Sequence, residues 1–456
     1  MAGIGFSIQK ILQRGTYTAS FQAYFYSTIV FSGPWILSIL TIFFLDFLAP
    51  ANINILDMIF FRTIIIYVFA ISFVTTGFFH FPLTRYLADQ LYAGQKEAII
   101  PTFNSAIFYV FLAQGGLAAS VLSFIDMELQ LKILVTLIYM TMSSLWVTMI
   151  FLTTVRAFRV ISFFYFLGSV LAVGISLFLG RMWGVSGYFI GYLLGHLLIV
   201  VSWSSRIFIE FASESIFDAR IFTALIKKRT LIFIGLFYNL AIWIDKIVFW
   251  FSPEAKTITA FFKTFPLYEN PVFFAHLTII PALSLLLIHI ETDFYRKFRR
   301  FYKGILDKAP YAYIQHLRDQ ITLSLKTSVV RLIRFQGTLA LLIIVFAPQI
   351  ASLVHIPWQQ IPIFRVAVLG TFLHSLLLTV LIIILYFDFQ LDALVTTGVF
   401  LLTNGVFTFF TMQMDTLFYG YGYLFSTLIS LIVALYLFDF KLRRLEYYTF
   451  ALVPVR

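Results

Sequence analysis

Long continuous apolar stretches dominate this chain, and most are long enough to cross a lipid bilayer. A membrane-spanning helix needs roughly 20 consecutive apolar residues. Charge-free stretches of that length number six before a polar segment and six after it, although the seventh is interrupted. We predict twelve spans, at residues 15–45, 63–83, 98–125, 133–155, 160–180, 182–205, 230–251, 270–290, 335–364, 366–387, 393–414 and 416–438.

The positive charges between these stretches predict the side of the membrane on which each loop lies. With the N-terminus inside, 25 of the 32 Lys and Arg residues fall in cytoplasmic segments and 7 in outer segments. Positive residues concentrate on the cytoplasmic side of membrane proteins. The sequence therefore predicts a multi-pass membrane protein with both termini in the cytoplasm.

The spacing of the spans suggests a division into two similar halves. We expect a lobe of six helices at 15–205, a cytoplasmic linker at 206–229 and a second lobe at 230–440, followed by a cytoplasmic tail at 441–456. The second lobe would carry a cytoplasmic loop at 291–334. Residues 1–14 space apolar side chains as an amphipathic interfacial helix does, and a simple polar leader is the alternative.

Composition supports a helical membrane protein over a soluble one. Hydrophobic residues make up 61% of the chain and charged residues only 12%, against about 25% in soluble domains. Barrel strands would alternate apolar and polar residues, which these runs do not. The absence of cysteine excludes disulfides and thiolate catalysis. No phosphate-binding loop or nucleophile elbow occurs, and no histidine pair has metal-ligand spacing, so we predict no enzyme activity, metal or cofactor.

The net charge of +11 would suggest nucleic acid as a partner of a soluble protein. Here the excess follows from topology, because the predicted cytoplasmic segments carry +12 and the outer ones −1. One segment of the cytoplasmic loop interleaves basic and aromatic residues beside the membrane. We expect it to dock a partner protein or anionic lipid rather than nucleic acid, through Arg296, Lys297, Arg299 and Arg300.

The seventh predicted span alone contains charge, at Asp245 and Lys246. A charge inside a span is costly and indicates a functional site by default. Adjacent helical residues lie about 100° apart, so the two side chains are expected to find separate partners. The alternative is a span that ends at Ile244, with the pair at the outer interface. Polar and aromatic residues of the same span would line a transport path: Tyr238, Asn239, Trp243 and Trp250.

Other candidates lie near the ends of the spans. Arg62 and Arg365 are expected at the outer side, either paired with Asp245, lining a vestibule, or reaching lipid phosphates. Arg85, Glu291 and Asp293 are expected at the cytoplasmic mouth, where the two acids would alternatively balance Arg296 and Lys297. Single histidines in spans are more often packing residues than proton relays. Possible helix breaks occur at Pro34 and around the eighth span, at Pro266, Pro271 and Pro281.

Several sequence blocks resemble the PelG family, the inner-membrane transporters of the Pel exopolysaccharide system. They are residues 2–6 (AGIGF), 32–38 (SGPWILS), 85–92 (RYLADQLY), 238–250 (YNLAIWIDKIVFW), 277–283 (LTIIPAL) and 290–295 (IETDFY). The resemblance implies an all-α, MATE-like member of the multidrug/oligosaccharidyl-lipid/polysaccharide (MOP) exporter superfamily, with two pseudo-symmetric six-helix lobes around a cavity. It also implies partners: a PelF-like cytoplasmic glycosyltransferase, a PelD-like cyclic-di-GMP receptor and a PelE-like scaffold protein.

The sequence and this resemblance leave three hypotheses. The first is export of a nascent amino-sugar polysaccharide, rich in N-acetylgalactosamine and galactosamine, for a biofilm matrix. Aromatic side chains, including Trp35, would stack on its sugar rings. The second is an ion-driven flippase of a lipid-linked oligosaccharide, with Asp245 as the titrating acid. The third is a non-conducting scaffold of the synthase complex.

Overall fold

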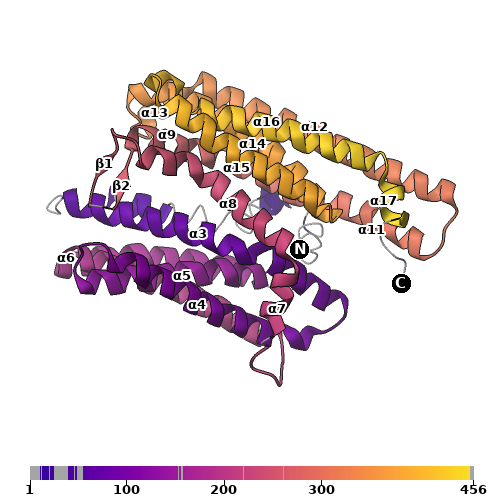
Figure 1. The fold of residues 1–456 in the computed structure, drawn as a ribbon, viewed down its shortest axis with the longest axis horizontal. Coiled ribbons are helices and arrows are strands. Elements are labelled where there is room, and N and C mark those ends of the chain that lie inside the picture. The colour runs from indigo at the N-terminus through magenta and orange to yellow at the C-terminus, as the bar shows by residue number, and fades with distance from the viewer. Residues whose placement is uncertain are drawn as a thin grey trace. The chain divides into compact units, whose positions relative to one another are not determined.

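The fold is known from a computed structural model. It describes residues 11, 13–19, 21–24, 40–45, 47–48, 55–152, 154–155, 158–218, 220–259 and 261–451. The chain divides into two compact units (Figure 1). Unit 1 comprises Met1–Phe31, Ile244–Val248 and Pro266–Arg456, and unit 2 comprises Ser32–Trp243 and Phe249–Phe265. The lobe boundaries at 15–205 and 230–440 stay predictions, and each unit is taken by itself below.

Unit 2 is a helical bundle in which α5 packs against α3, α4 and α6. Buried aromatic and aliphatic side chains from these helices and from α7 form one core. The unit ends in a short antiparallel hairpin. Its elements are α3 (Ile55–Tyr92), η1 (Lys96–Ala98), α4 (Ile99–Ser123), α5 (Leu129–Leu152), α6 (Phe158–Glu210), α7 (Arg220–Lys227), most of α8 (Arg229–Trp250), β1 (Lys256–Thr257) and β2 (Lys263–Thr264).

Helix α6 is a hairpin of two antiparallel helices. The bend lies at Trp183 and Gly184, where Gly184 has a φ of 60° that side-chain-bearing residues rarely adopt. Small residues let the two arms touch: a Cβ on Gly187, Gly191 or Gly195 would lie 2.1–2.4 Å from an atom of the first arm. Such spacing of small residues is typical of close helix contacts in membranes. The separate spans predicted at 160–180 and 182–205 thus correspond to the two arms.

Helices α3 and α8 of unit 2 also cross at glycines. A Cβ on Gly235 would lie 2.2 Å from the carbonyl oxygen of Gly77, so neither position has room for a side chain. One turn further along α8, the Asn239 side-chain amide donates a hydrogen bond to the Phe73 carbonyl at 2.7 Å. Close backbone contact and a polar crosslink fix the α3–α8 crossing.

Unit 1 is built around α14, α15 and α16, which run side by side (Figure 1). Helices α9 and α12 pack on α14, and α11 packs on α12. Its elements are α9 (Pro266–Leu277), α10 (Ile280–His289), η2 (Ile290–Phe294), α11 (Tyr295–Leu306), α12 (Tyr311–Val345), α13 (Ala347–Leu353), η3 (Trp358–Gln360), α14 (Ile361–Tyr386), α15 (Gln390–Met412), η4 (Thr416–Phe418), α16 (Tyr421–Leu442) and α17 (Leu445–Ala451).

The predicted break in the eighth span is confirmed. Helix α9 ends at Leu277 and α10 begins at Ile280, with Pro281 as its second residue. A proline in a helix leaves an upstream carbonyl without its usual N–H partner. Near the break, the Thr278 carbonyl accepts a hydrogen bond from the Gln336 side chain of α12 at 2.8 Å. The predicted kink at Pro34 lies outside the described residues.

Ten described helical segments are long and apolar enough to cross a membrane; one of them combines α9 with α10, and another is the α6 hairpin. The chain is therefore a multi-pass helical membrane protein. The count of twelve stays a prediction, since the span expected at 15–45 and the helix expected at 1–14 lie mostly outside the described residues. The segment 291–334, predicted as a cytoplasmic loop, consists mainly of η2, α11 and the first part of α12. One expectation was wrong: the stretch predicted as one span at 335–364 is divided among the end of α12, α13, η3 and the start of α14.

Candidate functional site

The charged pair of the seventh predicted span lies inside unit 1. Asp245 of α8 is fully buried, and the Lys246 side chain is only 11% exposed. The Lys246 ammonium donates to both carboxylate oxygens of Asp245, at 3.1 and 3.0 Å. The expectation that neighbours on a helix find separate partners was wrong, because the four-carbon lysine side chain is long enough to fold back. The carboxylate also accepts a hydrogen bond from Tyr268 of α9, at 2.7 Å.

Aromatic and imidazole groups of unit 1 surround this pair. The Lys246 ammonium lies 5.8 Å from the centre of the Tyr423 ring on α16, within cation–π range. The Tyr423 hydroxyl and Nδ1 of His374 on α14 are hydrogen-bonded at 2.6 Å. The His276 ring of α9 lies beside the Tyr423 ring, with centroids 5.4 Å apart. Four helices thus contribute to one buried cluster, which we call the Asp245 cluster: Asp245, Lys246, Tyr268, His276, His374 and Tyr423.

Local sequence features allow the Asp245 cluster to assemble. Gly370 of α14 makes room for Tyr423, since a Cβ there would lie 2.7 Å from the ring. His276 donates from Nδ1 to the Val272 carbonyl at 2.8 Å, which fixes the ring on α9. A buried ion pair is tolerated only where further hydrogen bonds satisfy its atoms, and Tyr268 supplies one. In the Asp245 cluster the positive charge of Lys246 thus faces the negative charge of Asp245, so that the ion pair has no net charge.

The remaining candidates of α8 belong to unit 2. Asn239 is buried and bonded to α3, as described above. Trp250 is buried with its ring stacked on Tyr67, 4.1 Å between centroids, and Trp243 lies between Phe69 and Trp250. Tyr238 is half-buried. Because Tyr67 covers one face of Trp250, that ring is a packing residue in this conformation, and Trp243 is the more accessible tryptophan. Trp35 and Pro34 lie outside the described residues.

The predicted arginines at the span ends are used in different ways. Arg365 of α14 is exposed and donates from Nε to the Ile344 carbonyl of α12 at 3.1 Å. Arg62 of α3 in unit 2 is half-buried. Arg85 of α3 pairs with Asp89 one turn later at 3.2 Å, and Asp89 also binds Lys228. Arg85 is thus held in a charge pair of unit 2.

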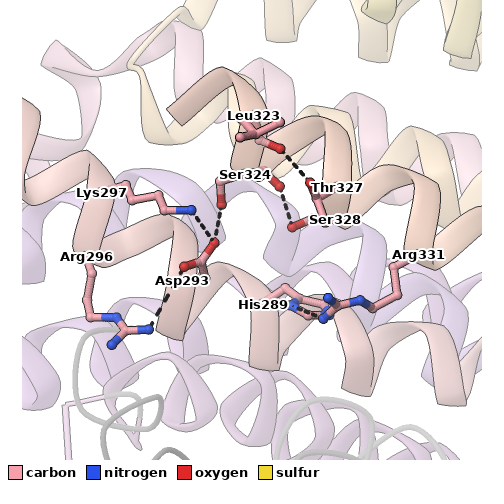
Figure 2. Close-up of polar contacts among 9 residues, drawn as sticks. All are labelled: His289, Asp293, Arg296, Lys297, Leu323, Ser324, Thr327, Ser328 and Arg331. Atoms are coloured by element: carbon pink, nitrogen blue, oxygen red, sulfur yellow. Dashed lines mark hydrogen bonds and ion pairs between the residues drawn. The ribbon is translucent and has the colours of Figure 1, made fainter. Parts of the chain in front are cut away.

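The acid predicted at the cytoplasmic mouth is part of a second polar cluster in unit 1 (Figure 2). Asp293 of η2 accepts from Lys297 at 2.8 Å and from Ser324 of α12 at 2.5 Å, and it lies 4.0 Å from Arg296. The alternative reading, in which this acid balances Arg296 and Lys297, is therefore confirmed for Asp293. Arg299 and Arg300 are exposed on α11, and the Glu291 side chain lies outside the described part of the structure.

Charge around Asp293 changes its acidity. Partial burial raises its pKa. The hydrogen bonds from Lys297 and Ser324, together with the charges of Lys297 and Arg296, lower it more, so the pKa of Asp293 lies below its ordinary value of 3.8. The carboxylate is ionised at neutral pH and ties η2 to α12.

Sequence reasoning missed four members of the Asp245 cluster: Tyr268, His276, His374 and Tyr423. The histidines were judged to be packing residues, and no spacing rule connects residues on α8, α9, α14 and α16. One signal was available, since tyrosine and histidine inside apolar spans need buried hydrogen-bond partners.

Comparison with known proteins decides the family. The model of the PelG family, described as "Putative exopolysaccharide Exporter (EPS-E)", matches residues 1–450. The chain belongs to the PelG family. The resemblance seen in the sequence blocks is confirmed, and the match also covers the C-terminal part, where the blocks gave no support. No curated protein matches this chain significantly.

Solved structures of transporters share the PelG fold seen here. A MATE transporter in complex with MaL6 has a TM-score of 0.65 at 11% identity, over 92% of this chain and 96% of its own. Outward- and inward-facing structures of a multidrug resistance MATE family transporter of the MOP superfamily give TM-scores of 0.61 and 0.60 at 12% identity. Both alignments cover 92% of this chain. They cover 96% of the outward-facing transporter chain and 95% of the inward-facing one. The protein thus has a MATE-like fold.

Proposed function

We propose that this protein exports a nascent amino-sugar exopolysaccharide across the bacterial inner membrane while a cytoplasmic glycosyltransferase elongates it. The observation that carries the proposal is the match of the PelG family over residues 1–450. The MATE-like fold supports a transporter rather than a scaffold. A PelF-like transferase, a PelD-like cyclic-di-GMP receptor and a PelE-like protein would complete the synthase, and the exposed Arg299 and Arg300 are available to dock them.

The Asp245 cluster favours export driven by polymerisation over an ion-driven flippase. A coupling cation would have to bind a carboxylate, and the ammonium of Lys246 already contacts both oxygens of Asp245. Protonation of Asp245 would leave the lysine charge buried without its carboxylate, which is costly. Because the Lys246 ammonium already balances the Asp245 carboxylate, this site does not need a proton or sodium ion from solution. Elongation of the polymer then supplies the driving force, and weak contacts along the path keep the chain moving.

Sealed inside-out vesicles that contain the protein and its synthase test this function. Nucleotide sugar is supplied outside, and polymer is measured in the lumen after external polymer has been digested. We expect lumenal polymer that persists when ionophores collapse proton and sodium gradients. Asp245→Ala should abolish it, and Arg181→Ala, at the exposed bend of α6, should not.

Each alternative gives a different result in the same vesicles. Polymer that is made but never reaches the lumen would reject export and support a scaffold. Lumenal product that requires both an ion gradient and an added lipid-linked precursor would support the flippase. Supplying N-acetylgalactosamine or glucose as the nucleotide sugar tests the amino-sugar assignment separately.

A further inference from the structure

Helix α12 carries a basic hollow that none of the functions above uses. The hollow has a volume of about 380 Å³, and its described lining residues are Lys326, Thr327, Val330, Arg331 and Arg334. We call it the α12 hollow. No carboxylate occurs among these lining residues. The Thr327 hydroxyl already donates to the Leu323 carbonyl at 2.8 Å, so the donors left for a ligand are the three cationic side chains.

The three cations share one face of α12. An α-helix turns about 100° and rises about 1.5 Å per residue. The five lining residues between positions 326 and 334 therefore fall within an arc of about 140° around the helix and a length of about 12 Å along it. Arg331 is oriented by His289 of α10, whose Nε2 lies 2.9 Å from the guanidinium (Figure 2). Because arginine can only donate, the imidazole accepts through a lone pair and adds no negative charge. His289 therefore holds Arg331 in place without neutralising its positive charge.

The same face of α12 becomes apolar and exposed toward the end of the helix. Leu341 and Val345 lie within the arc of the hollow, by the same 100° rotation, and are 65% and 64% exposed. From Arg334 to Leu341 the helix rises about 10 Å. One continuous stripe thus offers cations at one end and bare aliphatic side chains at the other. This order of chemistry matches a phospholipid that lies along the helix, headgroup toward Arg334 and acyl chain toward Val345.

We propose that the α12 hollow binds the phosphate headgroup of an anionic phospholipid. Arginine binds phosphate oxygens through paired N–H donors, and three cations suit an anion rather than a neutral sugar. N-acetylated sugars carry no charge for the three cations to bind, and free galactosamine units are cationic and would be repelled, so the hollow is distinct from the sugar path. The predicted cytoplasmic position of the first part of α12 places the site in the inner leaflet, where anionic headgroups attract basic residues.

Lipid binding by the intact protein tests the proposal. The full chain is reconstituted in phosphatidylcholine nanodiscs, and phosphatidylglycerol retained after detergent extraction is counted by native mass spectrometry over a titration. The variant carries Lys326→Gln, Arg331→Gln and Arg334→Gln. Its matched control loses three exposed cations at and beside α7, through Arg220→Gln, Lys227→Gln and Arg229→Gln. We expect apparent affinity to fall about 100-fold in the α12 variant and less than about 3-fold in the control.

Several outcomes would overturn the proposal. Equal losses in both variants would mean that phosphatidylglycerol senses overall charge and not the hollow. Inorganic phosphate that displaces the lipid at low millimolar concentration would assign the hollow to a soluble anion. If the triple variant fails to fold, Arg334→Gln alone is used, with an expected loss of about 5-fold against the control Lys227→Gln. An unchanged affinity in that single variant would again reject the site. None of these readouts depends on polysaccharide export.

Discussion

Two aspartate–lysine pairs in unit 1 have nearly the same geometry in opposite surroundings. The nitrogen–oxygen distance is 3.0 Å for Asp245–Lys246 and 2.8 Å for Asp293–Lys297. The side chains of the first pair are 0% and 11% exposed, and those of the second are 41% and 28% exposed. Each acid also accepts one hydroxyl, from Tyr268 and Ser324 respectively. The two pairs therefore differ mainly in how much water surrounds them.

This difference in exposure determines how much each ion pair contributes to the stability of the fold. An exposed ion pair contributes about 0–1 kcal/mol, because water solvates each charge nearly as well as the partner does. A buried ion pair stabilises the fold little more than two apolar side chains of similar volume would. Removal of one member, however, leaves a buried charge and costs about 3–5 kcal/mol. Asp245 and Lys246 are thus required together, whereas Asp293 and Lys297 are separable. The following substitutions test that contrast.

The largest effect is expected from Asp245→Asn. The amide keeps the shape and still accepts from Tyr268, but Lys246 loses its negative partner. We expect a loss of about 3–5 kcal/mol in the free energy of unfolding, measured by denaturant titration in mixed micelles. Lys246→Gln should destabilise comparably, as the mirror-image control. A loss below about 1 kcal/mol for both would show that water reaches this pair.

Removing both charges should restore part of the stability. In the double variant Asp245→Asn, Lys246→Gln no uncompensated charge is left, and the two amides can still hydrogen-bond. We expect the double variant to recover at least about 2 kcal/mol relative to the sum of the single losses, which a double-mutant cycle measures. Strict additivity would contradict the coupling inferred from the structure. Lumenal polymer in the double variant separates stability from transport, because a folded but inactive protein assigns the pair a direct role.

A matched pair of hydroxyl deletions comes next in size. Tyr268→Phe removes the hydrogen bond to the buried Asp245, and Ser324→Ala removes the one to the half-exposed Asp293. Hydrogen bonds to charged groups contribute about 1.5–3 kcal/mol when no water can replace the donor. We expect a loss in that range for Tyr268→Phe and less than about 1 kcal/mol for Ser324→Ala, by the same titration. Equal losses would mean that the two sites do not differ in hydration.

The contrast between the clusters also explains what the sequence could predict. Apolar run length located most spans, and the Lys and Arg bias suggested a topology, since both depend on the bilayer rather than on long-range contacts. Asp245 stood out because charge inside a span is rare. The local pairing of Asp293 with Lys297 was foreseen as an alternative, because i, i+4 neighbours lie on one helix face.

The missed features depend on tertiary contacts or on side-chain flexibility. His276, His374 and Tyr423 join the Asp245 cluster from helices far apart in sequence, and no spacing encodes that meeting. The contact between Asp245 and Lys246 was rejected on backbone angles alone, which overlooks the reach of lysine. The two arms of α6 were predicted as separate spans, 160–180 and 182–205. Their close contact was not, although the i, i+4 spacing of Gly187, Gly191 and Gly195 was a readable signal for it.

The smallest expected effect concerns Asp293 and its dependence on pH. The pKa of this acid is lowered in the folded state, so the unfolded chain binds its proton first as pH falls. Its stabilising contribution is therefore present above the unfolded pKa of about 3.9 and is lost as pH falls through the folded value. We expect Asp293→Asn to cost about 0–1 kcal/mol at pH 7, since the group is half exposed. The difference between variant and parent should shrink as pH falls below the unfolded pKa and disappear below the folded one, while Lys227→Gln on α7 serves as a charge control with no such dependence. A difference that grows on acidification would mean that burial, and not its cationic neighbours, dominates the acidity of Asp293.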